Sequence, residues 1–166
     1  MIYVGIDPAF REGGFWICII DMSDKTAQFQ GFARFADFIL WVMTPEAPDN
    51  AFWCIENSNM QNSSFDTTGG IKVAARKARN VGANQAVSQT TVDLLETIYG
   101  KKNVIPISPR SKGHKEESEA NFLRIVNSDG IKLHGYVGPN RQDKRDAYKI
   151  AMIGKQQCRI HQQTAR

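Results

Sequence analysis

The first twenty residues alternate between apolar and small or polar positions in a pattern that predicts two β-strands. Ile2, Val4 and Ile6 occupy every second position, which is the period of a strand. Asp7 follows directly, and the proline after it cannot donate the backbone N–H that would continue a ladder. A second apolar run spans residues 15–20, after a turn with two glycines. The pattern therefore predicts a first strand that ends in a carboxylate.

Strand and helix patterns continue along the rest of the chain. They predict further strands at residues 26–32, 51–55 and 103–107, and helices at residues 35–43, 71–80, 82–99, 117–126 and 140–157. The first three strands are close enough in sequence to form an antiparallel meander. The run at residues 51–55 is apolar throughout, as expected of a strand covered on both faces, and Glu56 follows it immediately. Residues 57–70 form a polar loop, and loops of that length in a compact domain are usually either functional or disordered.

The size and composition predict an ordinary globular protein. With 166 residues, 42% hydrophobic and 23% charged, we expect one domain over residues 1–158 and a polar, frayed tail over residues 159–166. No apolar run approaches the roughly 18 residues of a membrane span, and no signal peptide is evident. Cys18, Cys54 and Cys158 lack metal-ligand spacing, so we expect reduced thiols in a cytoplasmic protein.

Basic residues gather in two clusters, although the formal net charge is only +4. Such clusters suit a polyanionic partner, but a basic run is more often a solvated face than a binding site. The first cluster contains Lys72, Arg76, Lys77 and Arg79, and the second contains Lys101, Lys102, Arg110, Lys112 and Lys115.

Two further acids lie on the closing helix, on the stripe expected to face the sheet. Asp143 and Asp146 are three residues apart, and apolar positions such as Ile150 continue their face. An acid in the first turn of a helix is also stabilised by the helix dipole, which explains Asp143 but explains Asp146 poorly. We expect Lys144 and Arg145 to occupy the outward positions.

Asp7, Glu56, Asp143 and Asp146 therefore belong to three elements that one sheet and one packed helix can bring together. Carboxylates gathered in this way repel one another unless cations compensate their charge. Mg²⁺ or Mn²⁺, which prefer oxygen ligands, are the natural compensation, and two such ions roughly 3.5–4 Å apart can support phosphodiester hydrolysis. The three histidines are scattered, so zinc is not expected, nor is a small-molecule cofactor.

In order and spacing over nearly the whole chain, these residues resemble the RuvC-type Holliday junction resolvases of the RNase H-like superfamily. The matching motifs are Gly5-Ile6-Asp7-Pro8 and Ile55-Glu56 after strands, Gly82-Ala83-Asn84-Gln85 opening a helix, and Asp143-x-x-Asp146-Ala147 on the last helix. The resemblance implies an α/β, RNase H-like fold: a mixed five-stranded sheet, the first three strands antiparallel, with helices on both faces.

The resemblance also implies a function. Asp7, Glu56, Asp143 and Asp146 match the metal-binding acids of the family, and Lys115 is similar in place to a family lysine near the scissile phosphate. The resemblance implies a homodimer whose two sites cut opposing strands of a four-way DNA junction, with two Mg²⁺ or Mn²⁺ ions per site. We expect it in the cytoplasm of a bacterium or of a virus-infected host cell.

DNA contacts are expected from both basic clusters and from the polar segment after Glu56. Asn57, Ser58 and Asn59 stand where the family often has an aromatic residue that wedges between bases, which leaves Phe65 or Met60 as substitutes. Lysine and arginine also replace the small residues that commonly precede the last Asp-Ala. The residues expected to contact phosphate are Lys72, Arg76, Lys77, Arg79, Lys112 and Lys115.

Two alternatives to junction resolution stay open, and a third is excluded by the size of the chain. The same chemistry serves nucleases that cut flaps, replication forks or RNA–DNA hybrids. A catalytically silent branched-DNA-binding module would gain nothing from four acids where phosphate sits. An actin-like ATPase also places an acid after its first strand, but its duplicated domain does not fit in 166 residues.

Overall fold

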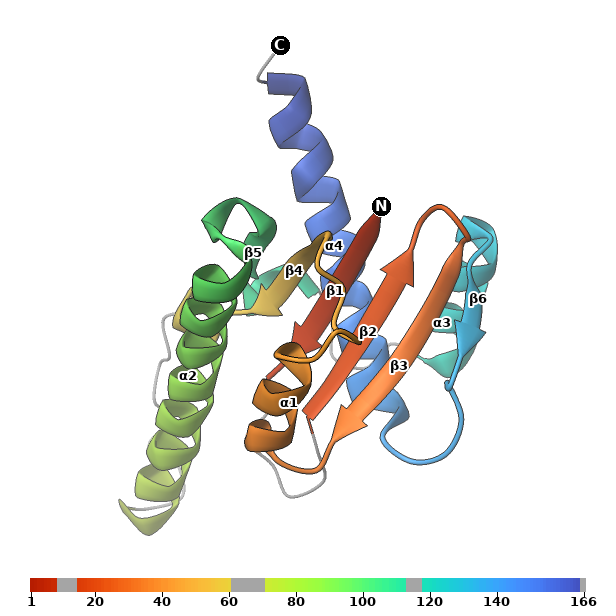
Figure 1. Cartoon of the computed structure of the whole chain (residues 1–166). Helices are drawn as coiled ribbons and strands as arrows, with labels where there is room; N and C mark the ends of the chain where they lie inside the picture. The colour runs from red at the N-terminus through yellow and green to blue at the C-terminus, as the bar shows by residue number, and fades with distance from the viewer. Residues whose placement is uncertain (9–14, 61–70, 113–117, 165–166) are drawn as a thin grey trace.

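The computed structural model describes residues 1–8, 15–60, 71–112 and 118–164, and over these ranges it is an α/β structure with one mixed six-stranded sheet and four α-helices (Figure 1). The strands are β1 (Ile2–Asp7), β2 (Phe15–Asp21), β3 (Thr26–Phe32), β4 (Ala51–Glu56), β5 (Val104–Ile107) and β6 (Lys132–His134). The α-helices are α1 (Phe35–Val42), α2 (Ile71–Tyr99), α3 (Glu119–Asp129) and α4 (Arg141–Thr164). Short 3-10 helices are η1 (Ser58–Met60), η2 (Lys101–Asn103) and η3 (Pro109–Lys112).

The strands lie in the order β5-β4-β1-β2-β3-β6. The expected antiparallel meander is confirmed, because β1 pairs with β2 and β2 pairs with β3 in antiparallel register. β4 is parallel to β1, and β5 is parallel to β4. The expected count of five strands is wrong, because β6 adds a parallel sixth strand beside β3. Its three residues are too few for a sequence pattern, and pairing with Thr26–Gln28 defines them.

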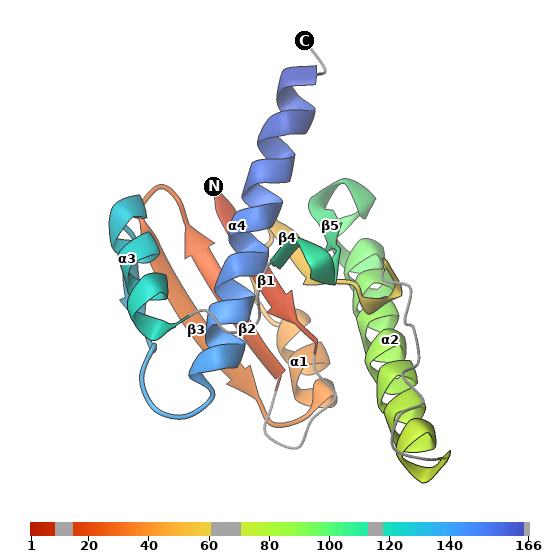
Figure 2. The same cartoon turned by 180° about the vertical axis from the view of Figure 1, so that it is seen from behind.

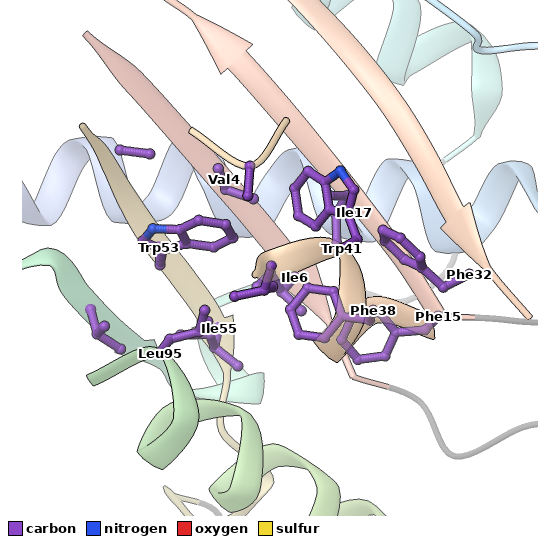
Figure 3. Packing of buried hydrophobic residues seen from close by; sticks show 14 of the residues in the cluster. Val4, Ile6, Phe15, Ile17, Phe32, Phe38, Trp41, Trp53, Ile55 and Leu95 are labelled. Atoms are coloured by element: carbon purple, nitrogen blue, oxygen red, sulfur yellow. The ribbon is translucent and has the colours of Figure 1, made fainter. Parts of the chain in front are cut away.

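Helices cover both faces of the sheet, as Figures 1 and 2 show from opposite sides. Helices α1 and α2 cover the face that carries Val4, Ile6 and Ile17. Figure 3 shows Phe38 and Trp41 of α1 packed there. Helices α3 and α4 cover the other face, where Tyr3 and Cys18 are buried. The alternation along β1 therefore assigns its odd-numbered residues to the α4 face.

Helix α4 lies almost backbone to backbone on β1 and β4. A Cβ atom added to Gly5 would lie 2.6 Å from Ala151 N and closer still to Ala147 O, distances that real atoms do not tolerate. A Cβ atom on Gly154 would meet Cys54 in the same way. Glycine at both contact points thus lets the helix approach the sheet, and this approach fixes where the first turns of α4 lie.

Two helix boundaries differ from expectation. Residues 71–99 form one continuous helix rather than two, since glycine at position 82 weakens a helix interior but, unlike proline, keeps the backbone N–H that continues it. Helix α4 continues to Thr164, through most of the range expected to form a tail. None of the helices in the described ranges is long and apolar enough to cross a membrane.

Candidate active site

Asp7 and Glu56 end two neighbouring parallel strands. The register pairs Ile6 with Ile55, so the next residue on each strand places the two acids side by side. Both belong to the face that α4 covers, because strand alternation puts Asp7 in phase with Gly5 and Glu56 in phase with Cys54. Both are partly buried. The carboxyl ends of β1 and β4 thus present two acids to the helix above them.

Asp143 and Asp146 lie on the first two turns of α4. Asp143 precedes Ala147 by one turn, and the carbonyl of Ala147 lies against Gly5. Asp146 precedes Ile150, which is fully buried, by one turn. Both acids are partly buried, and Asp146 Oδ1 accepts a hydrogen bond of 3.0 Å from Gln142 Nε2. The helix therefore carries its two acids toward the edge of the sheet where β1 ends.

The backbone brings the four predicted acids to one edge of the sheet, but the side chains are not closed around a point. Within the described ranges, no three His, Cys, Asp or Glu side chains form a group that could hold a metal ion as they stand. The chemistry of the set still suits a hard divalent cation, since all four candidates offer carboxylate oxygens. A cation would have to draw the side chains together, because carboxylates gathered without one repel one another.

Lys144 is buried, and the expectation that it points outward is wrong. Its side chain is 3% exposed, and Nζ donates hydrogen bonds to Gly135 O (3.0 Å) and Val137 O (2.7 Å). The same ammonium lies 4.4 Å above the ring centre of Trp16, the residue paired with Asp7 on β2. Burial lowers the pKa of Lys144, and the nearby charge of Arg141 lowers it further.

A helical spacing could have revealed this burial. Lys144 precedes Ala147, Tyr148 and Ala151 by three, four and seven residues, and all three are buried. The pattern was not recognised because a charged lysine is normally expected on the exposed face of a helix. Arg145 is also only partly exposed, and its guanidinium donates to Tyr136 Oη at 3.2 Å.

The first basic cluster lies on the half of α2 that leaves the core. Among the described side chains of α2, the buried ones fall between Ser88 and Leu95, and none at residues 72–87 is buried. Both views show this half reaching past the end of the sheet (Figures 1 and 2). No acid occurs between residues 71 and 92. The exposed cations of this projecting half are Lys72, Arg76, Lys77 and Arg79.

The structure supports the other residues expected to contact DNA less directly than it supports those of α2. Lys115 and Phe65 lie outside the described residues, as does the side chain of Lys112, whose backbone ends η3. Met60 is exposed and lines a groove of about 500 Å³ between β5 and the C-terminal half of α4. Asn57 is buried and closes the end of the β4–β5 pair, with its N–H donating to Ile107 O at 2.8 Å.

The chain was compared with models of protein families, with curated protein sequences and with solved structures. None of the three comparisons gives a significant match. Function is therefore inferred from the residues and contacts of the chain itself.

Proposed function

We propose that the protein is a metal-dependent, structure-selective endodeoxyribonuclease that resolves four-way DNA junctions. The observation that carries the proposal is that Asp7 and Glu56 end adjacent parallel strands on the sheet face covered by α4, whose first turns carry Asp143 and Asp146. Two strand ends and one helix that converge in this way offer four carboxylates to a single region. Carboxylates gathered in one partly buried region repel one another, and a divalent cation with oxygen ligands would offset that repulsion.

An RNase H-like fold is part of the proposal. The antiparallel order of β1, β2 and β3, the parallel addition of β4 and β5, and the presence of helices on both faces support it. In this reading β6 is an addition at the outer edge of the meander. It lies beside β3, on the opposite side of the sheet from β4, and leaves the proposed site unchanged.

Asp7, Glu56, Asp143 and Asp146 would hold two Mg²⁺ or Mn²⁺ ions. Bound ions would supply activation of a water and stabilisation of the leaving oxygen in phosphodiester hydrolysis. The chain itself sets the position of each carboxylate through the close contact of α4 with β1. Partial burial of the acids restricts the water that would otherwise compete with them for the cation.

DNA would be held mainly through its phosphates. The projecting half of α2 carries four exposed basic residues and no acid, so it attracts a polyanion without reading base edges. Selectivity for branched DNA would then come from shape. A homodimer would place one such site and one such helix on each side of the branch point, and a solution mass measurement tests the dimer.

Exchanging Arg76 and Arg79 for glutamine is expected to weaken binding to every DNA structure to a similar degree. Each lost phosphate contact lowers the slope of log affinity against log salt by about 0.9, so the double variant loses about 1.8. Fluorescence anisotropy at several salt concentrations measures both effects. Lys25→Gln with Lys132→Gln removes two exposed charges near β6 and serves as the matched control. An unchanged slope in the α2 variant would exclude this helix from the DNA interface.

The proposal is tested by incubating the protein with labelled DNA structures, with and without Mg²⁺. The set comprises a four-way junction, a flap, a fork, an RNA–DNA hybrid and a plain duplex. Paired nicks in opposing strands of the junction support resolution. Cleavage confined to flaps, forks or hybrids assigns the same chemistry to a different substrate, and tight junction binding without cleavage indicates a silent binding module.

A further inference from the structure

We infer that Lys144 is a positioning residue that fixes the rotation of the first turns of α4, and with it the direction in which Asp143 and Asp146 face. The inference rests on the proposed metal site and adds to it a residue of opposite charge that does not contact the substrate. Its basis is the placement of one buried ammonium group between α4, the β6–α4 connection and β2.

The ammonium group of Lys144 makes three contacts. Two backbone carbonyls, those of Gly135 and Val137, accept from Nζ, and the ring of Trp16 lies beneath the charge. A buried ammonium is costly unless its hydrogen bonds are made, so these contacts hold it in one place. With 3% of its surface exposed, Lys144 is poorly placed to bind phosphate, unlike the exposed cations of α2.

Helix geometry separates Lys144 from the acid it orients. Asp146 follows two residues later, about 200° around the helix axis, so the two side chains leave α4 on different sides. Tyr148 lies one turn after Lys144 and packs edge-on against Phe122 of α3 at 5.3 Å. The side that carries Lys144 thus faces β2 and α3, and Asp146 emerges on the other side of the buried stripe. Lys144 acts on Asp146 only by setting how the helix is turned.

The segment that Lys144 binds needs such an anchor. Gly135, Gly138 and Asn140 all have positive φ values, at 77°, 80° and 62°, so the connection into α4 turns sharply. The ring of Tyr136 packs this connection against the core. Its centre lies 5.0 Å from the ring centre of Phe122 and 5.6 Å from that of Phe29. Lys144 joins the helix to a segment already held by β3 and α3. This link fixes the rotation of the acid-bearing turns relative to the rest of the fold.

The test compares Lys144→Met, which keeps the length of the side chain but removes its charge, with Lys144→Arg, which keeps the charge and the donors. Lys132→Met, at an exposed lysine on β6, is the control. Mn²⁺ binding is measured by electron paramagnetic resonance, and hydrogen exchange of the amides at residues 138–147 is measured in metal-free protein. If Lys144→Met does not fold, Lys144→Gln replaces it under the same criteria.

Lys144→Met is expected to bind Mn²⁺ about 10–100-fold more weakly, as for other residues that orient metal ligands, and to exchange these amides faster. Lys144→Arg should retain most of the affinity, and the control should match the unmodified protein. Unchanged Mn²⁺ affinity in Lys144→Met would overturn the inference and leave the metal site standing. Failure of the unmodified protein to bind Mn²⁺ would overturn the proposed metal site and, with it, this role.

Discussion

Asp146→Asn is expected to lower the rate of Mg²⁺-dependent junction cleavage at least about 100-fold, since the loss of even an outer partner of a metal ligand costs 10–100-fold. Asparagine keeps the shape of the side chain and the bond from Gln142 but loses the charge that a divalent cation requires. Single-turnover nicking of a labelled junction measures the effect. Asp7→Asn and Glu56→Gln should behave alike, because the proposed ions are shared among the acids.

Binding separates loss of chemistry from loss of structure in this experiment. Asp146→Asn should bind the junction at least as tightly as the unmodified protein, because a negative charge near phosphate has been removed. Asp24→Asn changes an exposed acid in the β2–β3 turn and serves as the matched control. Mg²⁺-dependent cleavage by Asp146→Asn at the unmodified rate would place the chemistry elsewhere.

Gly5→Ala is expected to destabilise the fold by about 1–3 kcal/mol or more, the range found when well-packed cores are overfilled. The added methyl would lie 2.6 Å from Ala151 N and 2.9 Å from Ala151 Cβ, so α4 must move away from β1. For a domain of this size, each kcal/mol lowers the unfolding midpoint by about 2–4 °C. Circular dichroism during heating measures the shift.

Gly82→Ala is the matched control for this substitution. Gly82 lies in α2 with nothing within 4 Å of an added Cβ, so alanine should stabilise the helix by up to about 1 kcal/mol. Opposite signs for the two glycines would show that the contact with α4, and not glycine chemistry in general, decides the result. An unfolding midpoint for Gly5→Ala equal to that of the unmodified protein would contradict the close contact.

Most of the fold could be predicted from the sequence, because its strands carry strong patterns. The strand at Thr26–Phe32 agrees with expectation at both ends, and the runs before Asp7 and Glu56 lie on adjacent parallel strands. Strand β6 could not be predicted, since three residues give no period and pairing with β3 defines them. The sequence predicts two helices where α2 is one continuous helix. Glycine often marks a helix end in sequence, but Gly82 lies exposed in the interior of α2.

The positions of the four acids on the fold could be predicted from the sequence, whereas the burial of their neighbours could not, and their role as metal ligands stays a prediction. Asp143 and Asp146 share a helical face with buried apolar residues, and that spacing is visible in sequence. The burial of Lys144 was not expected, because a lysine is almost always exposed unless specific partners hold it. Those partners are two carbonyls of the connection before α4, and no sequence pattern identifies a carbonyl as an acceptor.

The glycine contacts of α4 have a consequence for engineering. Gly5 and Gly154 seat the helix on main-chain atoms and on Cys54, so the spacing between acid-bearing helix and sheet depends little on the large side chains of the opposite layer. Phe15, Phe38 and Trp41 fill that other layer without touching the α4 side. The aromatic layer under α1 is therefore the place to redesign this protein for heat resistance while the geometry around its acids is preserved.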